Sequence, residues 1–199
     1  MKKCNCVVNY HSQKEEYVLT VSMVKRGFDV LDMLWDTGAV SSVIYSNLLR
    51  NIKNVDKRQL DELEKLLTYN KESGTKGKYI CGSFGTVSNK GVHGILCCAR
   101  NVYVNHLHLE KFYFFILPAD ENKTRGLLGA DFISCCERQS HIASDEIFIR
   151  FDEELYEQKF KKLCDHYKEL STYDLNLLTK PKSQQSTKTD VILKNINFF

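Results

Sequence analysis

Short runs of apolar residues that alternate with polar ones recur along the first 151 positions and predict β-strands. Residues 17–24 and 28–35 flank the turn sequence Lys25-Arg26-Gly27, so they are expected to pair as a hairpin. Further strands are expected at 41–44, 93–99, 102–109 and 112–117, with a turn near Arg100-Asn101 and a last hairpin over 140–151 that turns at Ser144-Asp145. Many short strands at close spacing predict a mainly β fold that closes into a small barrel.

A different periodicity, with apolar residues three or four positions apart, predicts two long helices. Residues 56–69 place Leu60, Leu63, Leu66 and Leu67 at helical spacing, so an amphipathic helix is expected as an insertion between the strands. Asp152 is a candidate N-cap for a second helix. The apolar side of that helix is expected to comprise Leu155, Phe160, Leu163, Tyr167 and Leu170. Shorter helical turns are expected to begin at Ser46 and to span 132–137.

The chain of 199 residues divides by its patterns into three segments. Residues 1–151 are expected to form the folded domain, and residues 152–178 a C-terminal amphipathic helix. Residues 179–199 start rich in Lys, Ser and Gln and end in apolar residues. A flexible linker followed by an apolar tail is therefore expected at the C-terminal end.

Composition narrows the function classes. The net charge of +3 is small and dispersed, which argues against dedicated binding of nucleic acid. No run approaches the roughly 20 apolar residues that a membrane span requires, and no apolar signal core follows the N-terminal lysines. A soluble cytoplasmic protein without membrane or nucleic-acid partners is expected.

The chain contains eight cysteines, which are expected to be reduced thiols buried as small hydrophobic groups. Adjacent pairs such as Cys97-Cys98 point to opposite faces of a strand, so they do not suit a single metal ion. Cys4 and Cys6 with His11 could bind a soft ion, but no Cys-x-x-Cys pair completes a zinc site. No metal and no cofactor is the expectation, and a Cys/His metal protein is kept as an alternative.

The candidate chemistry lies at Asp36-Thr37-Gly38, where the strand that ends at Trp35 stops in a carboxylate, a hydroxyl and a glycine. A carboxylate at the edge of an apolar core is unfavourable unless it is hydrogen-bonded or paired. Gly38 permits a tight turn, and its amide can approach the Asp36 carboxylate closely. Thr37 offers a hydroxyl for a buried hydrogen bond that locks the loop. These features are typical of a carboxylate used in acid catalysis.

Two segments resemble the aspartic proteases. Residues 34–39, Leu-Trp-Asp-Thr-Gly-Ala, match the signature of two hydrophobic residues followed by Asp-Thr/Ser-Gly-Ala/Ser. Residues 126–133, Gly-Leu-Leu-Gly-Ala-Asp-Phe-Ile, resemble the family's closing motif, a strand that passes into a short helix. The resemblance implies an acid-protease barrel over about residues 17–151, with no catalytic role for Asp131. It implies catalytic roles for Asp36, Thr37 and Gly38, and substrate contacts for Ala39, Leu128 and Gly129.

In aspartic proteases the interval between the two motifs holds the flap, a mobile hairpin that closes over substrate. Residues 79–87 are punctuated by glycines, which suit a hairpin tip. The resemblance makes Gly82, Ser83, Phe84 and Gly85 candidate substrate contacts. Ser88-Asn89-Lys90-Gly91 is the alternative tip, because it is also a turn sequence. Both segments could also be ordinary loops.

The chain has one Asp-Thr-Gly and no second Asp-Thr/Ser-Gly, whereas this chemistry uses two carboxylates that share a proton. A two-fold axis beside Asp36 would bring in the second carboxylate from an identical chain. The resemblance is therefore to the single-lobed, homodimeric retropepsins, and it implies an aspartic endopeptidase that acts on polypeptides. The tail at 191–199 is expected to add a strand at the interface, to lie across the cleft, or to be disordered.

Two other function classes stay open on the sequence. A catalytically inactive peptide-binding or dimerisation module could keep the same fold, although the intact Asp-Thr-Gly-Ala argues against it. Serine or cysteine hydrolysis has less support, because the chain lacks a Gly-x-Ser-x-Gly elbow and its Cys and His residues follow no recognisable order.

Overall fold

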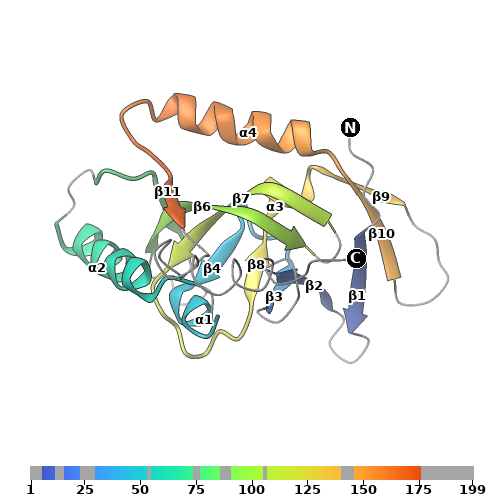
Figure 1. The fold of residues 1–199 in the computed structure, drawn as a ribbon, viewed down its shortest axis with the longest axis horizontal. Coiled ribbons are helices and arrows are strands. Elements are labelled where there is room, and N and C mark those ends of the chain that lie inside the picture. Colours follow the sequence, from blue (N-terminus) through green and yellow to red (C-terminus); the bar gives the residue numbers. More distant parts are fainter. Residues whose placement is uncertain are drawn as a thin grey trace, which may run out of the picture.

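The computed structural model describes residues 6–11, 16–22, 30–52, 55–73, 77–85, 91–104, 107–139 and 146–175. Its strands are β1 (Cys6–His11), β2 (Glu16–Ser22), β3 (Val30–Trp35), β4 (Val43–Tyr45), β5 (Cys81–Phe84), β6 (Val92–Val104), β7 (Leu107–Leu117), β8 (Gly126–Leu128), β9 (Cys136–Gln139), β10 (Glu146–Phe151) and β11 (Tyr173–Leu175). Its helices are α1 (Ser46–Arg50), α2 (Lys57–Ser73), α3 (Ala130–Ile133) and α4 (Glu153–His166). Strands occupy the centre of the molecule, with α2 at one end and α4 along one side (Figure 1).

The strands form one sheet that curls until it meets itself. Within the described residues, β6 pairs with β7, β7 with β4, β4 with β8, β8 with β3 and β3 with β2. β2 then returns to β6 through Val21↔Val104 and Ser22↔Tyr103. The predicted mainly β barrel is therefore confirmed. β1, β10 and β9 continue the sheet beyond β2.

The first predicted hairpin is confirmed by the antiparallel pairing of β2 with β3. The register runs from Val18↔Leu34 to Ser22↔Val30. Its predicted turn at Lys25-Arg26-Gly27 lies outside the described residues. The pairing brings the end of β3, and with it Asp36, into the middle of the sheet.

The predicted turn near Arg100-Asn101 is wrong, because residues 92–104 form one long strand, β6. Arg100 pairs with Lys111 and Val102 with Leu109, so one register runs through the predicted turn. Asn101 has a φ of 57°, a conformation that asparagine adopts more readily than most residues. The strand therefore accommodates a local irregularity there without ending.

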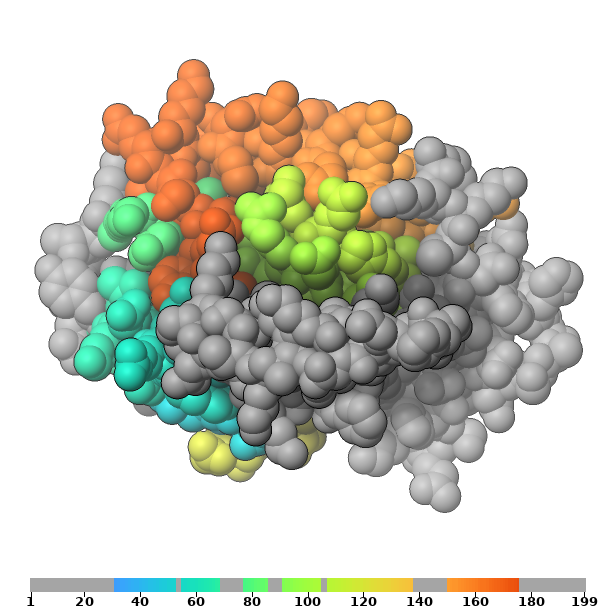
Figure 2. All heavy atoms as spheres, in the orientation of Figure 1, coloured from blue at the N-terminus to red at the C-terminus, as the bar shows by residue number. Residues whose placement is uncertain are grey.

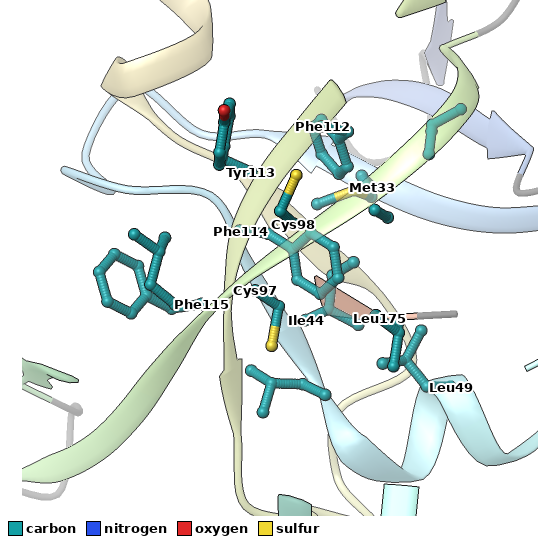
Figure 3. Close-up of a cluster of buried hydrophobic side chains, with 14 of the residues drawn as sticks. Met33, Ile44, Leu49, Cys97, Cys98, Phe112, Tyr113, Phe114, Phe115 and Leu175 are labelled. Carbon is teal, nitrogen blue, oxygen red and sulfur yellow. The ribbon is translucent and has the colours of Figure 1, made fainter. Parts of the chain in front are cut away.

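The predicted strand at 112–117 lies within β7, and every residue of that run is buried in the core. In Figure 3, Phe112 and Phe114 lie on the same side of the strand as Met33 and Ile44. Tyr113 and Phe115 point to the opposite side, as expected from the two-residue period of a strand. β7 is therefore covered on both faces.

The inserted helix is confirmed as α2, which contacts β6. Its buried or partly buried leucines are those that the spacing predicts, Leu60, Leu63, Leu66 and Leu67. The predicted helical turn at Ser46 is α1. Packing of the apolar stripe, rather than helix propensity alone, therefore fixes the position of the insertion.

The short helix after β8 begins earlier than predicted. It spans Ala130–Ile133 (α3) rather than 132–137, and Cys136–Gln139 form strand β9. β9 pairs with β10, so the predicted last hairpin starts at Cys136 instead of Ser140. Its predicted turn at Ser144-Asp145 lies outside the described residues.

The C-terminal helix is confirmed as α4, and Asp152 is its N-cap, since the Asp152 carboxylate accepts from the Leu155 N–H at 3.0 Å. Its apolar side differs from the prediction, because Leu155 is 37% exposed while Tyr156 and Phe160 are buried. The Phe160 ring stacks on Tyr113 of β7 with centroids 4.2 Å apart. The other predicted contacts, which are partly buried against the core, are Leu163, Tyr167 and Leu170. Atoms of α4 cover the upper side of the molecule in Figure 2.

The Tyr156 hydroxyl forms hydrogen bonds with the backbone of β7 at Tyr113, which lies outside the part of β7 that pairs with β4. β4 pairs with β7 only from Phe115 to Leu117. The hydroxyl accepts from the Tyr113 N–H at 3.0 Å and donates to the Tyr113 carbonyl at 3.4 Å. Burial raises the pKa of Tyr156 well above its ordinary value, so the hydroxyl keeps the proton that the second bond requires.

The helix predicted over 152–178 ends at His166, and β11 follows it. β11 runs parallel to β6, with Tyr173 opposite Cys97 and Leu175 opposite Ala99. A strand of three residues is too short to show a recognisable alternation in the sequence. The predicted linker and tail at 179–199 lie outside the described residues.

The cysteines whose side chains the structure describes are free thiols. Cys97 and Cys98 are buried in β6, and burial raises the pKa of Cys98 to about 11. They pack as small hydrophobic groups, as predicted. Among the described helices, none is long and apolar enough to cross a membrane.

We expect Tyr156→Phe to lower the free energy of unfolding by about 1–3 kcal/mol, because it removes the partner of two buried backbone groups while keeping the ring. Leu155→Ala is the matched control on the same helix, and a change of about 0.5 kcal/mol is expected there. Urea denaturation of the three proteins measures both values. Equal losses in the two variants would contradict the role assigned to the hydroxyl.

Candidate active site

Asp36 lies at the end of β3, directly after Trp35. β3 runs parallel to β8, and Trp35 is opposite Leu128. The Asp36 N–H donates to the Leu128 carbonyl at 3.0 Å, so the two strands stop together. The two motifs found in the sequence are therefore neighbours in the fold, as the resemblance implies.

The Asp36 loop is shaped around its own carboxylate. The Gly38 N–H donates to Asp36 Oδ1 at 2.8 Å, and the Ala39 N–H donates to the Asp36 carbonyl at 3.3 Å. A Cβ on residue 38 would lie 3.2 Å from Asp36 Oδ1, closer than most such contacts. Gly38 therefore permits the close approach of amide and carboxylate that the sequence predicts.

The residues after β8 bind the same loop from the other side. The Ala130 N–H donates to the Ala39 carbonyl at 2.8 Å, and the Asp131 N–H donates to the Val40 carbonyl at 3.1 Å. A Cβ on Gly129 would lie 2.4 Å from the backbone carbon of Ser41, so only glycine fits there. The two loops are thus held together through their backbones.

Asp131 and Ser42 join these loops a second time. The Ser42 N–H lies 2.9 Å from Asp131 Oδ1 and 2.8 Å from Oδ2, and the Ser42 hydroxyl donates to Oδ1 at 2.8 Å. The Phe132 N–H donates to the same Oδ1 at 2.8 Å. The Gly129 N–H in turn donates to the Ser42 hydroxyl oxygen at 3.2 Å. Asp131 is therefore a partly buried structural anchor of the site.

Burial shifts the titration of this anchor. Loss of solvent raises the pKa of the Asp131 carboxyl above its ordinary value of 3.8. The hydrogen bonds from Ser42 and Phe132, and the positive charge of Lys159, oppose that shift without cancelling it. The anchor thus binds a proton more readily than a carboxylate in water.

The catalytic candidates face solvent in the single chain. Asp36 and Ala39 are half-buried, Thr37 and Gly38 are exposed, and Val40 is 81% exposed. A buried hydrogen bond from the Thr37 hydroxyl would therefore require a second chain over the loop, and it stays a prediction. The fixed loop presents this group of side chains outward.

Leu128 and Gly129, two of the predicted substrate contacts, are buried in the single chain. Their contact with substrate stays a prediction. Both residues contact the Asp36 loop: the Leu128 carbonyl accepts from the Asp36 N–H, and Gly129 packs closely against the backbone of Ser41. Ala39 stays a candidate for contact with substrate.

The predicted flap interval forms a hairpin of β5 with β6, from Cys81↔Ile95 to Phe84↔Val92. Gly82, Ser83 and Phe84 are strand residues and not the tip, which corrects the first of the two tip predictions. Gly85 is exposed and follows the strand. Most of the alternative tip, residues 88–90, lies outside the described residues.

The base of this hairpin is fixed by aromatic packing. The Phe84 and Phe115 rings meet edge to face with centroids 5.0 Å apart. Gly82 and Gly94 pair across the strands beneath the Phe84 ring, and a Cβ on either would come within about 3 Å of it. Gly82 and Gly94 therefore permit the close packing of the Phe84 ring.

Sequence patterns do not distinguish Ser42, because it follows another serine in a short predicted strand. Its role depends on contact with Asp131, 89 positions away. Within the described residues, no group of three or more His, Cys, Asp or Glu side chains is placed to hold a metal ion. The candidate Cys4, Cys6 and His11 site involves side chains outside the described ones.

A comparison of structures finds a likeness to a retropepsin-like aspartic protease from Rickettsia conorii. The two chains are 13% identical, the match covers 76% of this chain and 96% of that chain, and the TM-score is 0.38. No protein-family model and no curated protein matches the chain. A likeness at this level does not establish the family, so the proposal below is based on the site residues themselves.

We expect Asp131→Asn to lower the free energy of unfolding at neutral pH by about 1–3 kcal/mol, because an amide cannot accept all the bonds that the carboxylate accepts. Between 3.8 and its raised pKa, Asp131 is protonated more often in the folded state than in the unfolded state. The wild type should therefore gain stability relative to the variant as pH falls through that window. Denaturant unfolding at a series of pH values measures the difference.

Ser42→Ala is the control for this titration, since it keeps the Asp131 carboxyl while it removes the hydroxyl. Its stability relative to Asp131→Asn should rise toward acid pH, as for the wild type. A wild-type advantage that shrinks as pH falls would contradict the raised pKa.

Proposed function

We propose that this chain is an aspartic endopeptidase whose active site forms between two identical chains. The observation that carries the proposal is the position of Asp36: its carboxylate stands at the end of a central strand, in a loop fixed by the Gly38 N–H and by residues 129–131. A carboxylate held in one geometry before substrate binds is what acid–base catalysis at a peptide bond requires.

In the proposed reaction, the two Asp36 carboxyl groups share one proton, since two like charges at close range do not both ionise readily. The ionised group takes a proton from water, whose oxygen attacks the carbonyl carbon of the peptide bond. The protonated group donates its hydrogen bond, and then its proton, to the carbonyl oxygen. The resulting gem-diol collapses and its C–N bond breaks. The leaving nitrogen takes a proton from the dyad while one gem-diol hydroxyl returns its proton to the dyad, so the shared proton is restored.

The exposed face of the Asp36 loop supports the homodimer. Thr37, Gly38 and Val40 are exposed next to a half-buried Asp36, and Val40 is a large apolar side chain without cover in the single chain. A second chain that covers this loop would remove the Val40 side chain from water, which favours association. A two-fold axis beside Asp36 would cover this face and pair the carboxylates in one step.

The proposed substrate is an extended polypeptide. The β5–β6 hairpin is the candidate cover for the bound peptide, with Ser83, Phe84 and Gly85 near its free end. A closing hairpin excludes water from the reacting groups, which strengthens every charge interaction there. Ala39 is the candidate contact on the opposite, loop side.

The second candidate function is a peptide-binding or dimerisation module without turnover. Its support is the same exposed loop face, which could serve association alone. The two functions differ in what Asp36 does, because a binding module needs the loop but not the carboxylate.

We expect Asp36→Asn to reduce peptide cleavage by about 10²–10⁴-fold, because the amide cannot exchange the catalytic proton. The amide oxygen can still accept from Gly38, so the fold and the dimer should be kept. Asp165→Asn, an exposed aspartate at the end of α4, is the matched control and should cleave like the wild type. Cleavage of a denatured-protein or peptide library at pH 4–7 measures the rates. A wild type without cleavage whose dimer and peptide binding survive Asp36→Asn would favour the binding module.

We also expect the cleavage rate per chain to fall on dilution, since a dissociated chain holds half of the dyad. The cleavage rate per chain is measured over a range of enzyme concentrations, and sedimentation of the same samples gives the fraction of dimer. The two quantities should fall over the same concentration range. Full activity in samples that sediment as single chains would contradict the shared site.

A further inference from the structure

The edge of β6 that faces away from β7 is covered by three short strands in turn. β5 pairs with residues 92–95, β11 with residues 97–99, and β2 with residues 103–104. β11 therefore fills the interval between the hairpin strand β5 and the barrel strand β2. It belongs to the C-terminal extension, which the sequence pattern treats as a separate helix.

The same extension binds the segment that leads into β5. The Ile80 N–H donates to the Ser171 carbonyl at 3.0 Å, and the Ser171 N–H donates to the Lys78 carbonyl at 3.1 Å. On its other side this segment accepts from β6, through the Leu96 N–H and the Ile80 carbonyl at 2.8 Å. Residues 78–80 thus lie between β6 and Ser171.

Side chains strengthen this arrangement. The Tyr79 and Tyr173 rings meet edge to face with centroids 5.2 Å apart, and Ile80 is buried. The Tyr173 hydroxyl donates to the Gln59 carbonyl of α2 at 3.4 Å. The root of the hairpin is therefore tied to the extension and, through it, to the inserted helix.

Farther along β5, Phe84 packs on Phe115, and a Cβ on Gly85 would meet no atom within 4 Å. The described part of the hairpin, β5 and its entry at residues 78–80, is therefore held at the Phe84 ring and at Ser171. Figure 1 shows β11 beside β6, below the end of α4.

We propose that residues 171–175, the clamp segment, set the position and the opening of the β5–β6 hairpin. Ser171 and Tyr173 are positioning residues, acting through the backbone of Lys78 and Ile80 and the ring of Tyr79. The expected effect on catalysis rests on the proposed function, in which this hairpin covers the peptide. The expected effect on the stability of the hairpin does not depend on that function.

The test compares the full-length wild type with Ser171→Pro, which removes the N–H that binds Lys78. Ser171→Ala is the matched control, because it keeps the backbone N–H and changes only an exposed side chain. Tyr79→Leu is a second, independent variant that removes the ring contact with Tyr173. Tyr103→Leu is its control, since Tyr103 packs on His108 at the far end of β6.

Amide hydrogen exchange is followed across the chain, and peptide cleavage is measured on the same samples. In Ser171→Pro and Tyr79→Leu we expect exchange in residues 81–84 to speed up about five- to tenfold, with β3 and β7 unchanged. KM should rise by a similar factor while kcat changes less, because the cover over the substrate is loosened. Both controls should match the wild type.

The outcomes separate the clamp from the enzyme. Unchanged exchange in residues 81–84 in either folded variant, or equal acceleration in β3 and β7, overturns the clamp, because the segment would then be a general part of the barrel. Should Ser171→Pro fail to fold, Tyr79→Leu decides alone. If residues 81–84 exchange faster in the two variants but the wild type cleaves no peptide, the clamp is supported and the proposed function is overturned.

Discussion

The bond between Asp131 and Ser42 is the contact on which the candidate site depends. The partly buried Asp131 carboxylate accepts from N–H and O–H donors of Ser42 and Phe132, and the same serine hydroxyl accepts from the Gly129 N–H. Because Ser42 closely follows the first motif and Gly129, Asp131 and Phe132 belong to the second, the bond fixes the Asp36 loop relative to the end of β8.

The barrel is completed by parts of the chain that lie outside the expected protease domain. α4 brings Tyr156 to the backbone of Tyr113, and β11 covers β6 between β5 and β2. Both contacts satisfy strand groups that would otherwise face solvent, and exposed strand edges are sites of unwanted pairing. The extension is thus part of the fold, and its contacts reach the root of the hairpin proposed to cover substrate.

The features that sequence predicts well are those set by local patterns. The β2–β3 hairpin, α2, the Asp152 cap and the nearness of Gly38 to Asp36 all follow from neighbouring residues. Asn101 misleads because asparagine marks turns, yet here it takes a positive φ within a continuing strand. Tyr156 rather than Leu155 docks α4, because the choice between adjacent residues depends on where Tyr113 lies. Ser42 and β11 leave no local pattern, since each is defined by a partner far along the chain.

The pairing of β11 also bears on the order in which the molecule assembles. The Tyr173 hydroxyl bonds to Gln59, which precedes it by 114 positions. A ribosome must therefore synthesise nearly the whole described chain before the middle of β6 gains its last neighbour. Until then the nascent barrel carries an open strand edge, the kind of surface that chaperones shield during translation.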